Sequence, residues 1–205
     1  MLSGQKIVLA VTGSIAAYKS CELLRLLIKR GTEVSVIMTE AAQRFVTPLS
    51  FQALGAKKVY TGDWGDSASP IPHIEATKDA SLLLVAPATA NILAKAAQGL
   101  ADDLLSAAIL AARCPVAYAP AMNTFMWHNQ ATQRNVTQLT QDGAIFLGPD
   151  SGEQACGDIG SGRMLEPEDI IELLQGAFSP RLLDRCRVLI TAGPTYEPID
   201  PVRGI

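Results

Sequence analysis

The sequence contains little that would mark a metal-binding or disulfide-stabilised protein. Its four cysteines, at positions 21, 114, 156 and 186, are far apart and form no CxxC pair, and there are only two histidines. This pattern disfavours both a structural zinc site and a disulfide framework. We therefore expect no metal site in this chain, and the cysteine usage favours a reducing, cytoplasmic compartment.

The sequence also lacks runs of basic residues and long uninterrupted apolar segments. Its net charge is −3 and its Lys and Arg residues are dispersed, so nothing directs it to nucleic acid or an anionic membrane. The most apolar stretch, residues 80–110, is interrupted by Pro87, Lys95 and two aspartates and cannot span a bilayer. With 48% hydrophobic and 18% charged residues, the 205-residue chain has the composition of an ordered globular protein with one substantial core.

Short apolar strands alternate with amphipathic helices along the chain. Strands are predicted at residues 7–11, 34–38, 82–86, 116–119 and 144–147, with Pro87 ending the third, and helices at residues 15–30, 91–99, 104–112, 130–142 and 167–178. This alternation predicts an α/β fold with a doubly wound, mainly parallel, Rossmann-like sheet covered on both faces. Residues 61–72 and 148–163 lack periodicity and are interpreted as irregular, functional lid segments.

Small and polar residues follow the predicted strands, at the edge where parallel sheets bind ligands. Gly13 and Ser14 lie where the first strand passes into a helix, and backbone N–H groups there suit a phosphate. The GxGxxG dinucleotide fingerprint is absent, since this turn has one glycine. Thr39 follows the second strand, and Thr89 and Asn91 follow the third. Each turn alone could be a tight turn or a helix cap, but neighbouring ones favour a shared cofactor.

Four further residues are candidates for chemistry. His73, in PHIE, could act as a base, a common role of histidine in catalysis, although a lone histidine is more often structural. Asn123, in PAMNTFMW, offers donors and an acceptor that can hold a carboxylate. Cys156 lies among four glycines, which favours a mobile flap over a core position. Arg163 could pair with a substrate anion or tether that flap.

Together and in this order, these motifs resemble the homo-oligomeric flavin-containing cysteine decarboxylases, in particular the members that act on 4′-phosphopantothenoylcysteine in coenzyme A biosynthesis. The resemblance covers residues 6–178. PAMNTFMW (residues 120–127) fits the family's PxMNxxMW pattern at every fixed position, and ACGDIGSGRM (residues 155–164) is similar to its substrate-clamp flap. GLADDLL (residues 99–105) departs from it, with two aspartates where relatives commonly have Asn and Asp, and leaves the cofactor contacts of that segment open.

The resemblance implies a flavoprotein fold, FMN as cofactor, and an enzyme that removes CO₂ from its small-molecule substrate after transient oxidation of the substrate thiol. It implies that His73 is a base, that Asn123 holds the substrate carboxylate and that Cys156 donates a proton. The implied FMN contacts are Gly13, Ser14, Ile15, Ala16, Thr39, Thr89, Ala90 and Asn91, and the implied substrate contacts are Met122, Asn123, Met126 and Arg163. Self-association as a trimer or a multiple of trimers is also implied.

The end of the sequence indicates a second domain. Residues 1–180 are predicted to form the FMN-binding decarboxylase domain, and residues 186–205, which include RVLITAGPTYEPIDPVR, are similar to the start of a phosphopantothenate–cysteine ligase. The resemblance thus implies a bifunctional protein whose ligase half would use Mg²⁺. On pattern alone, residues 187–191 could instead be a last strand of the same sheet.

Other functions remain open. One alternative is a decarboxylase of peptidyl C-terminal cysteine, against which the ligase-like tail argues. A second is a non-enzymatic regulatory protein on the same fold, against which the retained His73, Asn123 and Cys156 argue. A third is an NAD(P)-linked oxidoreductase, which the missing glycine fingerprint disfavours.

Overall fold

The computed structural model describes residues 2–62, 70–178 and 189. One sheet contains the strands β1 (Lys6–Val11), β2 (Glu33–Met38), β3 (Val59–Thr61), β4 (Leu82–Ala88), β5 (Val116–Pro120) and β6 (Ile145–Phe146). Their order is β3-β2-β1-β4-β5-β6, and all neighbouring strands pair in parallel. The predicted doubly wound, Rossmann-like α/β fold is therefore confirmed.

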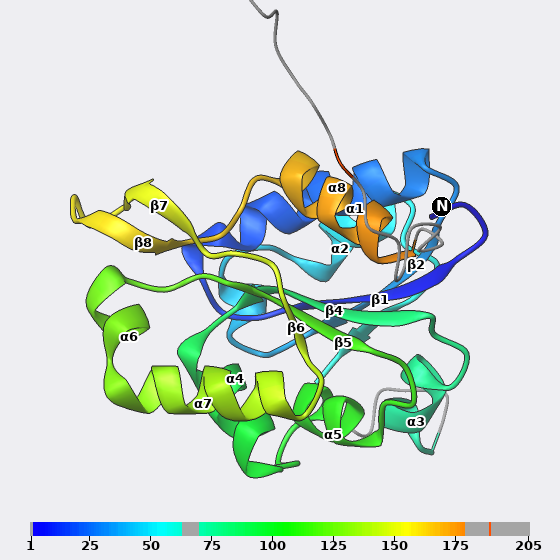
Figure 1. The fold of residues 1–205 in the computed structure, drawn as a ribbon. Coiled ribbons are helices and arrows are strands. Elements are labelled where there is room, and N and C mark those ends of the chain that lie inside the picture. Colours follow the sequence, from blue (N-terminus) through cyan, green and yellow to red (C-terminus); the bar gives the residue numbers. More distant parts are fainter. Residues whose placement is uncertain (1, 63–69, 179–188, 190–205) are drawn as a thin grey trace, which may run out of the picture.

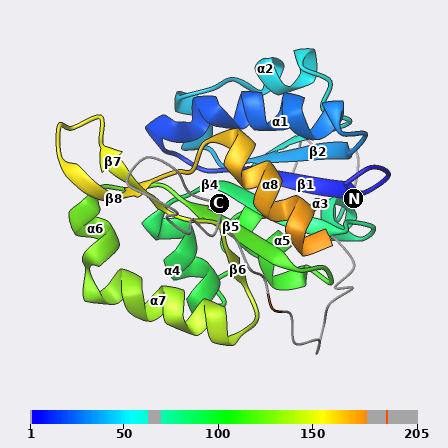
Figure 2. The ribbon, with the colours of Figure 1, turned by 45° about the horizontal axis from the view of Figure 1, so that its top comes forward.

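Helices cover both faces of this sheet (Figures 1 and 2). On one face lie α1 (Lys19–Lys29), α2 (Pro48–Ala53) and α8 (Pro167–Phe178). On the other lie α3 (Pro72–Thr77), α4 (Ala90–Gln98), α5 (Leu104–Ala111) and α7 (Gln130–Gln141). Among the described helices, none is long and apolar enough to cross a membrane.

Side chains of each central strand alternate between the two cores. In β1, Ile7 and Leu9 pack in the core beneath α1 and α8, whereas Val8 and Ala10 pack in the core formed with α4 and α5. A strand buried on both faces needs apolar residues at every position, because neither face meets water. This requirement explains why the strands appear in the sequence as continuous apolar runs.

The structure corrects several predicted boundaries. β4 does not end before Pro87 but continues to Ala88, with a shift of register against β5 between Val85 and Ala88. The predicted helix over residues 15–30 is a 3₁₀ helix, η1 (Ile15–Tyr18), followed by α1. Residues 148–163 are not irregular, because they contain the antiparallel hairpin of β7 (Asp150–Glu153) and β8 (Ile159–Arg163). Apolar periodicity also does not reveal the short elements η2 (Ala42–Arg44), α2, β3, α3 and α6 (Thr124–His128).

The chain order reverses between β1 and β4. The sheet extends from β1 to β2 and β3 in one direction, and from β4 to β5 and β6 in the other. At such a reversal the loops after the two strands diverge and leave a crevice at their carboxyl ends. The β7–β8 hairpin and α6 lie at this end of the molecule, whereas α3 lies at the opposite end (Figures 1 and 2).

Candidate active site

Hydroxyl groups at the carboxyl ends of β1 and β4 are tied to the backbone. Thr12 Oγ1 donates to the carbonyl of Pro87 at 2.7 Å and lies 3.4 Å from Thr89 Oγ1, which links the two strands. Ser14 Oγ and Thr89 Oγ1 each cap the helix that follows by accepting a backbone N–H. These capping hydrogen bonds fix the side chains of Ser14 and Thr89 beside the crevice. Each hydroxyl oxygen acts as the acceptor in its cap, so each O–H group can still donate to a ligand.

A cavity of about 970 Å³, the large cavity, lies beside these hydroxyls. Its size is at the upper end of the range of about 300–1,000 Å³ that is usual for cofactor sites. Gly13 forms a tight part of the wall, because a Cβ there would lie 2.5 Å from Ala41 Cβ. The predicted FMN contacts that line it are Gly13, Ser14, Thr39, Thr89, Ala90 and Asn91.

An ion-paired cluster closes one side of the large cavity. Lys95 Nζ lies 2.7 Å from Asp102 Oδ1 and 2.6 Å from Asp103 Oδ2, and Asp103 also caps α5 by reciprocal hydrogen bonds with Ser106. Hydrogen bonds to Asp102 and Asp103 raise the pKa of Lys95, and the bond from Lys95 lowers the pKa of Asp102. The two aspartates whose contacts the sequence leaves open therefore hold a charged lysine against the cavity.

A smaller cavity of about 440 Å³ adjoins the large one. The two cavities share Ser14, Ala121 and Met122 in their walls, so groups bound in them would meet at these residues. The predicted site residues that line the smaller cavity are Ser14, Ile15, Ala16, Met122, Asn123, Cys156 and Arg163. Met126, a predicted substrate contact, lines the large cavity. The structure thus brings together most residues that the sequence selects.

The β7–β8 hairpin with its turn, residues 150–163, is called the flap below. Two glycines let it lie close to the segment before α6. A Cβ on Gly160 would lie 2.5 Å from Thr124 Oγ1, and a Cβ on Gly162, whose φ is 138°, would collide with the Met122 carbonyl oxygen. The Met122 N–H donates to the Gly162 carbonyl at 2.9 Å, and the Thr124 N–H donates to Gln154 Oε1 at 3.0 Å. Close backbone approach of this kind requires glycine.

A thiol, an amide and a carboxylate meet where the flap faces α6. Asn123 Nδ2 lies 3.2 Å from Cys156 Sγ and 2.7 Å from Asp158 Oδ2, and Cys156 Sγ lies 3.3 Å from Asp158 Oδ2. Asn123 also caps α6, because its Oδ1 accepts the N–H of Phe125 at 2.8 Å. Two predicted site residues are therefore in direct contact, and Asp158 is a third partner that the sequence analysis does not select.

Two cations and one carboxylate also line the smaller cavity. Lys19 Nζ donates to Glu166 Oε1 at 2.7 Å and to the Met164 carbonyl at 3.2 Å, and Arg163 Nη2 donates to the same Glu166 oxygen at 2.9 Å. Lys19 is 9% exposed. A lysine this buried on an amphipathic helix is unusual and must be paired, yet the sequence analysis does not select it.

His73 lies apart from these residues. It is half-buried on α3, at the end of the sheet opposite the flap (Figures 1 and 2), and as the described residues place it, it lines neither cavity. Within one copy of the chain, the structure therefore does not bring the predicted base together with Asn123 and Cys156.

Comparison with known families and proteins gives consistent matches. The Flavoprotein family matches residues 1–179, and the DNA/pantothenate metabolism flavoprotein C-terminal domain matches residues 183–205. The chain is 50% identical over 205 residues to the Coenzyme A biosynthesis bifunctional protein CoaBC of Vibrio cholerae, and 50% identical over 206 residues to that of Escherichia coli. Each alignment covers 100% of this chain and 51% of the relative, so the chain spans about half the length of the curated relatives it matches.

Solved structures agree with these matches. A cysteine-to-serine variant of PPC decarboxylase, complexed with pantothenoylaminoethenethiol, superposes with a TM-score of 0.76 at 33% identity and covers 85% of this chain and 98% of its own. The FMN-dependent cysteine decarboxylase SpaF superposes with a TM-score of 0.72 at 33% identity and covers 86% and 99%.

The ion pair between Lys19 and Glu166 predicts a pH-dependent contribution to stability. The hydrogen bond from Lys19 lowers the pKa of Glu166 below its unfolded-state value of about 4.3. The stabilisation is therefore complete above that value and is lost as the pH falls through the folded-state pKa. Glu166→Gln leaves the buried Lys19 ammonium without its carboxylate partner, while the Glu166 side chain itself is 47% exposed, so the variant should lower the free energy of unfolding by about 1–2 kcal/mol near neutral pH.

Urea unfolding followed by circular dichroism measures this difference. The gap between wild type and variant should shrink as the pH falls below the unfolded-state value and through the lowered folded-state pKa of Glu166. Glu22→Gln is the control, because its partner Arg25 lies on the surface and the pair should contribute little. A gap that widens on acidification would contradict the assigned role of the pair.

Proposed function

This chain belongs to the Flavoprotein family, and from that premise we propose that it is the FMN-dependent decarboxylase part of a coenzyme A biosynthesis enzyme. Its proposed substrate is 4′-phosphopantothenoylcysteine, and its proposed products are 4′-phosphopantetheine and CO₂. The observation that carries this proposal is a cofactor-sized cavity that shares a wall with a smaller cavity containing Asn123 and Cys156. The similarity to CoaBC proteins and to a PPC decarboxylase supports the pathway and the reaction.

The residues of the large cavity fit FMN. The hydroxyls of Ser14, Thr39 and Thr89 and the N-terminus of α4 supply hydrogen-bond donors for a phosphate, and Met38 and Leu104 supply apolar surface for a ring. The Lys95–Asp102–Asp103 cluster carries a net negative charge and would repel a phosphate. We therefore assign the phosphate to the hydroxyl-lined side of the cavity.

Decarboxylation requires an electron sink, because loss of CO₂ from an ordinary amino-acid carboxylate leaves a carbanion that nothing stabilises. When bound, FMN supplies a reversible two-electron oxidation of the substrate CH₂–SH group to a thioaldehyde, whose C=S group accepts the electrons left by CO₂. The task of the chain's own residues is then to place the substrate and to control protons.

Asn123 and Cys156 are suited to those two tasks. The Asn123 amide can donate to the substrate carboxylate, and its position is fixed because its Oδ1 caps α6. The Cys156 thiol, 3.2 Å from that amide, lies where it can protonate the ene-thiolate that remains after CO₂ departs. In agreement with this order of events, the ligand of the solved cysteine-to-serine variant is itself named as an ethenethiol.

The wall that contains Lys19 and Arg163 is suited to the phosphate of the substrate. Two cations share one carboxylate there, so this cluster of three side chains has a net positive charge. Arginine and lysine are the usual partners of phosphate groups. We assign the phosphate end of the substrate to this wall, which places the cysteine end towards Asn123 and Cys156.

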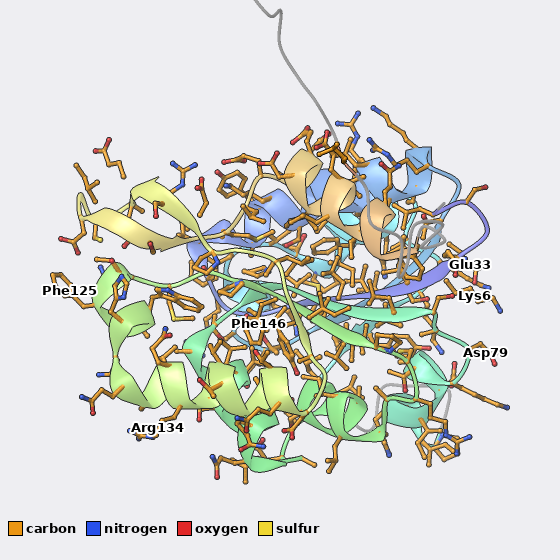
Figure 3. The ribbon with its side chains drawn as sticks, viewed as in Figure 1. Lys6, Glu33, Asp79, Phe125, Arg134 and Phe146 are labelled. Atoms are coloured by element: carbon orange, nitrogen blue, oxygen red, sulfur yellow. The ribbon has the colours of Figure 1, made fainter. Side chains whose placement is uncertain are left out.

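Because His73 lines neither cavity of its own chain as described, we assign its role as a base to a neighbouring copy in a trimer or a multiple of trimers. Large apolar side chains are exposed near the flap and η1, which favours burial against another subunit. Ile15 is 61%, Phe125 75% and Ile159 80% exposed. Figure 3 shows Phe125 at the edge of the molecule at this end.

The proposal extends to the longer protein to which this sequence is similar. Residues 183–205 match the DNA/pantothenate metabolism flavoprotein C-terminal domain, although the predicted ligase segment, apart from Leu189, lies outside the described residues. We propose that the full-length protein also joins phosphopantothenate to cysteine in a Mg²⁺-dependent ligase half, and that it works in the cytoplasm.

Cys156→Ser tests the proposed reaction. The variant should retain bound flavin and still release CO₂, while formation of 4′-phosphopantetheine should fall by at least about 100-fold, because a hydroxyl is a much weaker proton donor than a thiol. The measurement is mass spectrometry of the products formed from 4′-phosphopantothenoylcysteine, together with the amount of CO₂ released.

Cys114→Ser is the matched control, because this half-buried thiol lies outside both cavities and its loss should leave turnover unchanged. Full product formation by Cys156→Ser would rule out the thiol as the proton donor. Absence of CO₂ release by the wild-type protein would rule out the proposed function itself.

A further inference from the structure

The hydrogen-bonding capacity of the Asn123 amide is already in use. A primary amide nitrogen has two N–H groups. In this structure Nδ2 has two partners, Asp158 Oδ2 at 2.7 Å and Cys156 Sγ at 3.2 Å. Asn123 Oδ1 accepts the N–H of Phe125 and keeps the side chain from turning. A substrate carboxylate can therefore be held by this amide only if one flap partner gives up its place.

Asp158 is the partner that resembles the incoming group. Its side chain ends in a carboxylate, which is the group that the substrate would present to Asn123. It makes the shorter of the two contacts with the amide, and the same Oδ2 atom lies 3.3 Å from Cys156 Sγ. One carboxylate oxygen of the flap thus engages both residues to which the proposed function gives a role.

The surrounding backbone allows this carboxylate to leave. Asp158 lies in the turn of the flap, where the Gln154 N–H donates to its carbonyl at 2.8 Å. The adjoining Gly157 has a φ of 87°, and a Cβ there would meet nothing within 4 Å. Ala155, Cys156 and Gly157 are all exposed. The turn beside the half-buried Asp158 is therefore open to solvent, which leaves space for Asp158 to change rotamer.

We propose that Asp158 is a specificity-determining residue that occupies, on the Asn123 amide, the position taken by the substrate carboxylate. This inference rests on the proposed function. The substrate carboxylate binds by replacing Asp158, and the same displacement separates Asp158 from the Cys156 thiol. When the carboxylate is lost as CO₂, Asp158 can return to Asn123, so the decarboxylated product has no group that competes for this position.

The proposal predicts a selective effect of the Asp158 charge on ligands that carry a carboxylate. The probes are two conjugates that contain an alcohol in place of the thiol and so cannot be oxidised to a thioaldehyde. They are phosphopantothenoylserine, which has the carboxylate, and phosphopantothenoylethanolamine, which lacks it. Isothermal titration calorimetry gives the Kd of each for the FMN-loaded full chain and for its Asp158→Asn variant.

Asp158→Asn should tighten binding of the serine conjugate at least about tenfold, because it removes the repulsion between two carboxylates at one amide. Binding of the ethanolamine conjugate should change less than about threefold. Asp158→Ala, which removes the competing oxygen altogether, should shift the ratio of the two Kd values in the same direction. Glu153→Gln is the control for net charge, since Glu153 lines the same cavity and should leave the ratio nearly unchanged.

An unchanged or reduced preference for the serine conjugate in both Asp158 variants would overturn the inference. A shift of equal size in Glu153→Gln would also overturn it, because the effect would then be one of overall charge. If the wild-type protein binds neither conjugate, the proposed function fails, and this inference fails with it. Binding of both conjugates with no effect of Asp158 would overturn the inference alone.

Discussion

The site depends on the reversal of chain order between β1 and β4. In this sheet the connections run in opposite directions from β1 and β4, which leaves a crevice at the carboxyl ends of these two strands while the strands stay hydrogen-bonded to each other. The hydrogen bond from Thr12 to the Pro87 carbonyl fixes the two ends relative to each other. Gly13 then lets the turn after β1 approach Ala41 closely. The turns after β1 and β4 leave space between them for the large cavity, and the close packing of Gly13 against Ala41 forms part of its wall.

The smaller cavity is formed by the flap. Glycines at positions 160 and 162 allow β8 to lie against the segment that carries Met122 and Asn123, and the ion pairs of Glu166 connect the end of the flap to α1. Met122 lines both cavities, so a cofactor in the large cavity and a substrate thiol in the smaller cavity can lie next to each other. The Asn123 amide, the Cys156 thiol and the Asp158 carboxylate are therefore brought together by the packing of the backbone. Contacts between the three side chains then fix their positions.

The sequence predicts the parts of this arrangement that depend on apolar pattern and on named motifs. The buried strands, the long helices and the family are confirmed, since runs such as residues 7–11 and PAMNTFMW are distinctive. The sequence does not predict the flap hairpin, because its strands consist mainly of Gly, Ser and charged residues and have no apolar face. Lys19 precedes Leu23 and Leu27 at four-residue spacing, on the buried face of α1, and that spacing was the available signal. No sequence pattern shows that Asp158 contacts Asn123, because the two residues are 35 positions apart and meet through the packing of the flap against α6.

We propose that a flavin in the large cavity exchanges electrons with the substrate thiol in the smaller cavity. The most direct test is the visible absorption spectrum of the FMN-loaded protein during a single anaerobic turnover of 4′-phosphopantothenoylcysteine. The absorbance of oxidised flavin should fall on mixing and recover as 4′-phosphopantetheine forms, with no added oxidant, because the electrons removed from the substrate return to it. A protein that takes up no FMN, or a flavin spectrum that stays constant while product appears, would contradict the account.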